Sequence, residues 1–263
     1  MEDTRNGVED AQFLAGSPLR LRILGLLLER GVAEKRELRA EIDASRTTIQ
    51  RNLVALEEER LIKEVENSTY SHTPIGELVI EEFSNLLDTL ELARQWKPLV
   101  RWLPAEDGNL DPRVFESAEI VLASEHDPYA TVNRHVEAVQ SAESIRALLP
   151  QIGKQAAETA GRRVNGGELQ VEIVFEQSTF DALLEDPHYA DALETHIRSP
   201  GGAVLAYPGR IPYYLGLIDD LVQVGFADEE GIPRAMVESD APEARAWAER
   251  TYERFRSRST EAT

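Results

Sequence analysis

The N-terminal third of the chain carries its apolar residues at helical spacing in three short segments. We expect helices over residues 17–31, 35–42 and 46–59, the first opened by Ser-Pro and ended by glycine. Residues 61–65 and 70–72 have strand-like character and flank a polar turn, which predicts a hairpin. Three helices followed by a hairpin is the element order of a winged helix-turn-helix domain.

A longer helix is expected after this hairpin. It begins at Thr73-Pro74 and is predicted to run to Trp102, with a break near Pro98. Its apolar stripe advances in steps of three and four over about three heptads, which predicts a self-association seam and a homodimer. We therefore divide the chain into a winged-helix domain over 1–73, a dimerisation helix over 74–103 and a further domain over 104–263. Residues 1–11 are polar and expected to fray.

The C-terminal half alternates between strand and helix patterns, which predicts a three-layer α/β domain whose last strands are antiparallel. A polar linker over 104–112 precedes it. The first strand, over 119–124, is expected to be buried. The other expected strands cover 169–175, 203–207, 213–218, 221–227 and 234–238, and the expected helices cover 127–141, 150–164, 178–185, 189–197 and 241–255.

Composition narrows the class of protein. The formal net charge is −20, and Lys35, Lys63, Lys97 and Lys154 are the only lysines among 28 basic residues. This balance favours a halophilic source, although an ordinary acidic protein remains the alternative. The chain has no cysteine, and its five histidines form no HxxxH or HxH pair, so we expect no metal and no cofactor. The apolar N-terminal run is too short to span a membrane, which favours a cytoplasmic protein.

The third helix carries the strongest functional signal. Residues 45–54 hold two arginines and no carboxylate, in a chain that is otherwise strongly acidic. A helix that reads the DNA major groove must present polar donors on the face turned away from its own core. We therefore predict a double-stranded DNA interface, with the hairpin contributing backbone contacts. Its candidate residues are Ser45, Arg46, Thr47, Thr48, Gln50, Arg51, Asn52, Lys63 and Tyr70. The alternative is a winged-helix scaffold that binds another protein.

Polar residues after the predicted strands of the C-terminal domain are candidates for binding a small-molecule effector, because ligands bind at the carboxyl ends of strands in open α/β sheets. Tyr213 and Tyr214 alternate, so only one of them is expected to face the interior. The candidates are Ser124, His126, Tyr129, Gln177, Thr179, Tyr207 and Tyr213. The sequence contains no GxSxG, P-loop or GxGxxG motif, so an enzyme is disfavoured.

Several segments resemble known regulators. Residues 17–31, 45–61 and 70–76 resemble archaeal winged-helix transcription regulators, in which the wing strand runs into a T-P-x-G helix start. About residues 110–258 look like a domain first described in the methanogenesis (filament) regulatory protein. The matching stretches are 119–122, 168–175, 184–189, 211–214, 219–220 and 244–249.

The resemblance implies a transcription regulator whose C-terminal domain senses an effector. Such domains look like the ligand domains of the sugar-responsive TrmB regulators, which share a phospholipase-D-like fold. No histidine in this sequence has a lysine two residues later, so the HxKxxxxD signature of that fold's enzymes is absent and the domain is expected to be catalytically inactive. The sequence as a whole predicts a homodimer that binds a pseudo-palindromic operator with two recognition helices about 34 Å apart.

Overall fold

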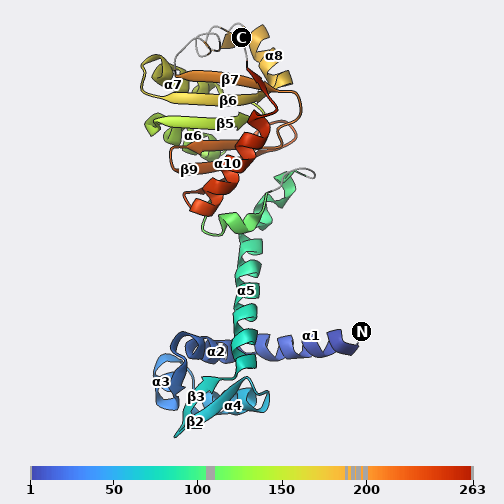
Figure 1. The fold of residues 1–263 in the computed structure, drawn as a ribbon, viewed down its shortest axis with the longest axis vertical. Coiled ribbons are helices and arrows are strands. Elements are labelled where there is room, and N and C mark those ends of the chain that lie inside the picture. The colour runs from blue at the N-terminus through green and yellow to red at the C-terminus, as the bar shows by residue number, and fades with distance from the viewer. Residues whose placement is uncertain are drawn as a thin grey trace. The chain divides into compact units, whose positions relative to one another are not determined.

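The computed structural model describes residues 2–104, 110–186, 189–190, 193, 197 and 201–261. It divides into two compact units, Met1–Glu91 and Leu92–Thr263. The division falls inside the long helix α5 (Pro74–Trp96), whereas the sequence analysis places one boundary at each end of that helix. Each unit is described by itself below (Figure 1).

The first unit contains the predicted succession of three helices and a hairpin, and this prediction is confirmed. Two further elements, α1 and β1, were not predicted. The strands form an antiparallel sheet in the order β1-β3-β2. The elements are α1 (Glu2–Ala15), α2 (Pro18–Arg30), β1 (Val32–Glu34), α3 (Lys35–Glu41), α4 (Arg46–Glu58), β2 (Ile62–Glu66), β3 (Thr69–His72) and the first part of α5.

The helix α1 replaces the frayed terminus that the polar composition of residues 1–11 had predicted. Its C-terminal end is held by packing: Leu14 is buried in the core of the unit, and the guanidinium of Arg20 lies 3.9 Å from the centre of the Phe13 ring. A short polar helix is marginal in water on its own. Tertiary contacts at one end therefore account for an element that the hydrophobic pattern does not indicate.

The start of α4 and its inward face follow the sequence closely. The Ser45 hydroxyl accepts a hydrogen bond from the Thr48 backbone N–H at 3.1 Å, as an N-cap should. Ile49, Leu53 and Leu56 are fully buried in the core of the unit. The opposite face of the helix is thereby turned outward.

The T-P-x-G segment fixes the start of α5 against the turn that follows α4. The Thr73 hydroxyl donates to the Arg60 carbonyl at 2.6 Å and accepts from the Gly76 N–H at 3.0 Å. The Thr73 N–H donates to the Leu61 carbonyl at 3.0 Å. A Cβ on Gly76 would lie only 1.7 Å from the Leu61 carbonyl oxygen. Glycine is therefore required because backbone passes directly against backbone.

The second unit is built around an eight-stranded sheet in the order β11-β7-β6-β5-β8-β9-β10-β4. β5, β6 and β7 are parallel, and every other neighbouring pair is antiparallel. Its strands are β4 (Glu119–Leu122), β5 (Ser144–Leu149), β6 (Gln170–Glu176), β7 (Gly202–Tyr207), β8 (Tyr214–Ile218), β9 (Leu221–Ala227), β10 (Pro233–Ser239) and β11 (Thr260–Glu261). The antiparallel ending of the predicted sheet is confirmed.

Helices cover both faces of this sheet, so the predicted three layers are confirmed (Figure 1). One core joins α10 and the end of α5 to the sheet through residues such as Trp247, Tyr252 and Trp96. The other core joins α6 and α7 to the opposite face through Val139 and Val164. The helices are η1 (Lys97–Trp102), η2 (Pro112–Phe115), α6 (Ala130–Ser141), α7 (Lys154–Asn165), α8 (Gln177–Glu185) and α10 (Pro242–Arg256).

Three expectations for this unit need correction. The strand predicted over 119–124 is not buried, because β4 pairs only with β10 at the edge of the sheet. The parallel strand β5 was missed, and the helix predicted from residue 150 begins only at Lys154. The break predicted near Pro98 is confirmed, since α5 ends at Trp96 and a 3₁₀ helix follows. Most of the helix expected over 189–197 and much of the linker expected over 104–112 lie outside the described residues.

No single helix among the described residues is long and apolar enough to cross a membrane. Taken together, the helices Gly7–Ala15 and Pro18–Arg30 are long and apolar enough for a membrane span by length and composition only. A bend of 90° separates them.

Candidate functional site

The outward face of α4 is polar and accessible. Arg46, Thr47 and Arg51 are exposed, and Thr48 and Gln50 are half-buried. The first turn of the helix contains no acidic residue. Lys63 is exposed on β2, the first strand of the hairpin. Two positive charges and several hydrogen-bonding groups therefore face outward on one helix, beside the free N–H groups of its N-terminus.

Two candidates for this face are buried instead. Asn52 is 6% exposed: its amide oxygen accepts from the Ser17 hydroxyl at 3.1 Å, and its amide nitrogen donates to the Thr48 carbonyl at 2.9 Å. Tyr70 is 3% exposed in the core of the unit, and burial raises the pKa of its hydroxyl. Both side chains lie in the interior of the unit and not on its surface. This corrects the expectation that they contact DNA.

The Ser45 and Thr48 hydroxyls also have a local role, since they lie 2.8 Å apart while Ser45 caps the helix. The exposed face of α4 therefore reduces to Arg46, Thr47 and Arg51, with the half-buried Gln50 beside them and Ser45 and Thr48 at its start.

The second unit contains a pocket of about 400 Å³ between the sheet and the helices α6 and α7, which we call the apolar pocket. It opens at the carboxyl ends of β5 and β6, where Leu149 and Glu176 line it. Thr131 and His135, one turn apart on α6, also line it. The Thr131 hydroxyl is buried, and no partner for it is found in the described part of the chain. A buried hydroxyl without a partner is costly unless something else supplies one.

A buried polar network lies behind His135. The Gln223 amide nitrogen donates to a Glu238 oxygen at 2.6 Å, which leaves the Gln223 amide oxygen facing His135 Nδ1 at 2.8 Å. On this assignment His135 carries its proton on Nδ1, and Nε2 is an acceptor. Arg134 pairs with the buried Glu238. Burial lowers the pKa of His135, against a smaller opposing effect of its hydrogen bond to Gln223, so the ring is neutral at neutral pH.

The two tyrosines at the start of β8 pack on opposite faces of the sheet, Tyr213 fully buried and Tyr214 half-buried. Tyr213 packs in the core beneath α10, and burial raises its pKa to about 12. Tyr214 packs on the α6–α7 side, with its hydroxyl 3.2 Å from His135 Nδ1. Its ring lies over Gly216 and Gly225, where an added Cβ would come within 3.0 Å of it. The expectation that only one tyrosine faces the interior is wrong, because a three-layer domain has two interiors.

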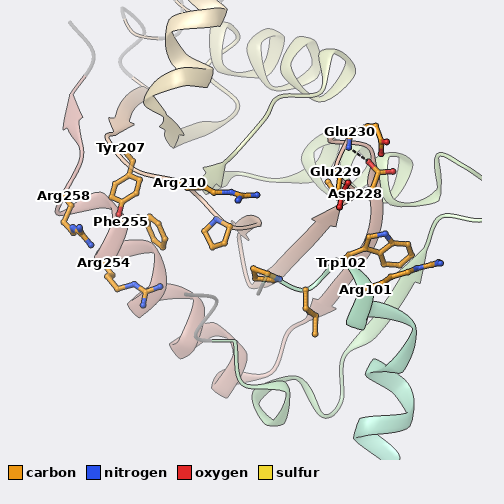
Figure 2. A pocket seen from close by; sticks show the side chains of 14 residues that line it. Arg101, Trp102, Tyr207, Arg210, Asp228, Glu229, Glu230, Arg254, Phe255 and Arg258 are labelled. Carbon is orange, nitrogen blue, oxygen red and sulfur yellow. Dashed lines mark hydrogen bonds between the residues drawn. The ribbon is translucent and has the colours of Figure 1, made fainter. Parts of the chain in front are cut away.

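A second pocket in this unit has a volume of about 930 Å³. We call it the arginine pocket, because Arg101, Arg210, Arg254 and Arg258 line it (Figure 2). Its other walls include Trp102, Tyr207, Phe255 and the acidic turn residues 228–230.

The predicted effector residues divide among several places. Tyr207 lines the arginine pocket, and Tyr213 lines the apolar pocket. Gln177 is exposed and donates to Asp181 at 2.8 Å, while the Thr179 hydroxyl donates to the Pro150 carbonyl at 2.7 Å. Ser124, His126 and Tyr129 are exposed and line neither pocket, because β4 is an antiparallel edge strand rather than the first parallel strand.

Sequence reasoning missed the groups that form these pockets. Thr131 and His135 belong to a helix whose interior face is otherwise apolar, and Gln223 lies in an apolar strand. Polar residues at positions that the periodicity assigns to the interior were the available signal. Within the described ranges, no group of three or more His, Cys, Asp or Glu could hold a metal ion.

Two family models match the chain. Residues 8–95 match the HVO_A0261 N-terminal domain, and residues 128–258 match the middle domain of the methanogenesis regulatory protein FilR1. No curated protein matches the chain.

Several solved structures have similar folds. TrmBL2, described as an archaeal chromatin protein, has a TM-score of 0.44 at 14% identity, with 94% of each chain covered. NucT from Helicobacter pylori has a TM-score of 0.45 at 13% identity, covering 55% of this chain and 98% of its own. The phospholipase D family member Nuc from Salmonella typhimurium has a TM-score of 0.41 at 15% identity, covering 55% and 97%.

The first match covers the winged-helix candidate, and the second covers most of the α/β unit. The second is the domain that residues 110–258 were found to resemble in the sequence analysis. The α/β unit therefore carries, over residues 128–258, a domain of the FilR1 middle-domain type.

Proposed function

We propose that this protein is a dimeric regulator whose first unit is a winged helix that binds operator DNA through α4. The observation that carries the proposal is the outward face of α4, where Arg46, Thr47 and Arg51 are exposed, Gln50 is half-buried, and no acid lies in the first turn. The match of residues 128–258 to a domain of a regulatory protein supports a role in transcription. A helix of this kind fits the major groove, which admits one helix and displays a distinct pattern of donors and acceptors for each base pair.

The two ends of the proposed interface have different tasks. We assign Arg51 and Gln50 to base edges, because arginine pairs with guanine through two parallel hydrogen bonds and glutamine can pair with adenine. Arg46 and the N-terminus of α4 suit a phosphate, as does Lys63 on the hairpin. Because the chain has a net charge of −20, phosphate contacts alone supply little affinity, and base contacts must provide more of it.

The test is a gel shift and footprint on the region upstream of the protein's own gene, in molar potassium chloride. Arg51→Ala is expected to weaken binding by about 1–3 kcal/mol if Arg51 meets a guanine. Arg22→Ala is the matched control, since it removes an exposed arginine of α2 and leaves α4 intact. An unchanged footprint in the Arg51 variant contradicts the assignment of α4. If the wild type binds no duplex at all, the winged-helix scaffold for a protein partner is the better function.

Dimerisation is proposed to use the exposed side of α5. Leu86, Leu87 and Leu90 are 48%, 43% and 52% exposed, whereas Val79 and Phe83 pack against the core of the first unit. Together they continue a spacing of three and four residues, which is the pattern of a helix pair. A second copy of the same helix is the partner that this repeat fits, because a pseudo-palindromic operator requires two copies of α4.

Effector sensing is proposed for the apolar pocket, and we also propose that the α/β unit is an inactive phospholipase-D-like domain. The pocket lies at the carboxyl ends of parallel strands, and its buried Thr131 hydroxyl and His135 Nε2 offer hydrogen-bonding groups to a ligand. Native mass spectrometry of the purified protein is expected to detect a bound small molecule. Thr131→Val, which keeps the shape and removes the hydroxyl, is expected to lower its occupancy. Equal occupancy in both proteins contradicts a role for Thr131.

A further inference from the structure

The arginine pocket gathers four arginines that make no ion pair with the described residues. In a chain of net charge −20, Arg101, Arg210, Arg254 and Arg258 line one pocket. None of the four makes an ion pair with a residue in the described ranges, whereas other arginines there, such as Arg134, Arg234 and Arg256, do. Figure 2 shows Arg254 and Arg258 on one side of the pocket, Arg101 on the other, and Arg210 between them.

The acidic residues of the pocket do not neutralise this group. Asp228 is engaged by Arg234 at 2.6 Å and by the N–H groups of Glu230 and Ile232 at 3.2 and 2.9 Å. These contacts outweigh its desolvation and lower its pKa, so it is a fixed part of the turn. Among the described residues that line the pocket, Glu229 and Glu230 then remain as the negative charges opposite four arginines.

Three of the four guanidinium groups are held against aromatic rings. Arg101 lies 4.0 Å from the centre of the Trp102 ring, Arg254 lies 5.2 Å from that of Phe255, and Arg258 lies 5.6 Å from that of Tyr207. Such stacking restricts a flexible side chain and leaves its N–H donors free. The pocket thus combines oriented donors with apolar walls, and guanidinium forks match the geometry of phosphate and carboxylate.

We propose that the arginine pocket binds a small molecule that carries two or more phosphate or carboxylate groups on an apolar or ring-shaped body. The four arginines require a ligand with several negative charges. Trp102, Tyr207 and Phe255 favour a ligand whose central part is apolar or ring-shaped. A volume of about 930 Å³ is that of a metabolite-sized site. This site adjoins the apolar pocket, with which it shares Arg210, Pro212 and residues 227–229 as lining, but Arg101, Arg254 and Arg258 line the arginine pocket alone. The proposal does not depend on DNA binding.

Isothermal titration calorimetry of the full chain tests the proposal, with inorganic pyrophosphate and succinate as probes at constant ionic strength in potassium chloride. We expect saturable binding of at least one probe. Preference for pyrophosphate identifies a phosphorylated ligand, and preference for succinate identifies a polycarboxylate. Saturable binding of neither probe overturns the proposal.

Variants locate the site. The double substitution Arg254→Gln and Arg258→Gln is expected to raise Kd at least tenfold. Arg250→Gln removes one exposed arginine from the same helix, α10, but lies outside the pocket and is expected to leave Kd within twofold. Equal weakening by Arg250→Gln, or none by the double variant, overturns the assignment. Far-UV circular dichroism of each variant confirms that it is folded.

Discussion

Asn52 illustrates how one buried side chain can look like part of an interface. It lies on α4 between residues of the exposed face, and its chemistry suits recognition of adenine. In the structure it instead bridges α4 to the start of α2 through Ser17. Helical periodicity predicts which positions are near the core. An asparagine at the border between the buried and exposed faces can belong to either, so the pattern does not show whether it is buried.

We predict that Asn52→Ala lowers the free energy of unfolding of the first unit by about 1–3 kcal/mol, because it leaves the Ser17 hydroxyl without its acceptor. Urea denaturation followed by far-UV circular dichroism measures the loss. Thr47→Ala, on the exposed face, is the control and is expected to change stability by less than about 0.5 kcal/mol. A loss of DNA binding by Asn52→Ala without any loss of stability contradicts the structural role.

A second prediction concerns Gly76. Gly76→Ala brings a Cβ against the Leu61 carbonyl, so the chain must shift where α5 begins. Overpacking against backbone is expected to cost about 3 kcal/mol or more. Thermal denaturation should show a clearly lower Tm than the wild type. Gly25→Ala is the matched control, since an added Cβ there meets no atom within 4 Å, and it is expected to leave stability equal or higher. A Tm in Gly76→Ala equal to that of the control disproves the close contact.

At the scale of elements, regular patterns were predictable and short or edge elements were not. The helices α2, α4 and α10 and the strands β6 to β10 follow the sequence closely. The strands β1 and β11 have three and two residues, and they exist only because β3 and β7 offer backbone partners. β5 was missed because its six residues, SIRALL, include Ser144 and Arg146 and show no clear strand period between two helix patterns.

The candidate site was predictable to a similar extent. Arg46, Thr47 and Arg51 follow from helical periodicity together with the N-cap at Ser45. The contact between His135 and Gln223 joins residues 88 positions apart, and no local pattern predicts it. Ser124, His126 and Tyr129 were placed in a pocket because they follow a predicted strand. The sequence shows where a strand lies along the chain, but not its position and direction in the sheet, and β4 is an antiparallel edge strand.

The network between α6 and β9 predicts a pH dependence of stability. Burial lowers the pKa of His135 from its ordinary 6.5, so the unfolded chain takes up a proton at a higher pH than the folded one. The stabilising contribution is therefore present above pH 6.5 and is lost as the pH falls below it. Calorimetry from pH 8 down to pH 5 should show a steeper loss in the wild type than in His135→Gln. Identical slopes contradict the prediction. His72 has the same direction of shift in the first unit and remains in both proteins.

For the whole molecule, the seam on α5 predicts a change of assembly. Leu86→Glu with Leu90→Glu places charges where two helices would pack and is expected to convert a dimer into a monomer in sedimentation velocity measured in molar potassium chloride. The monomer should protect half of the operator with reduced affinity. Ile232→Glu, which alters an exposed apolar residue of the second unit, is the control and should leave the mass unchanged. A dimer that persists in the double variant excludes this seam.

The positions of the three tryptophans have a practical consequence. Trp96, Trp102 and Trp247 all belong to the second unit. Intrinsic indole emission therefore reports on that unit alone, and melting of the winged-helix candidate passes unseen by it. Trp102 stacks beneath Arg101 at the wall of the arginine pocket, while Trp96 and Trp247 are buried. Ligand binding in the arginine pocket is therefore expected to change the fluorescence of Trp102, so binding can be followed by tryptophan emission without an added dye.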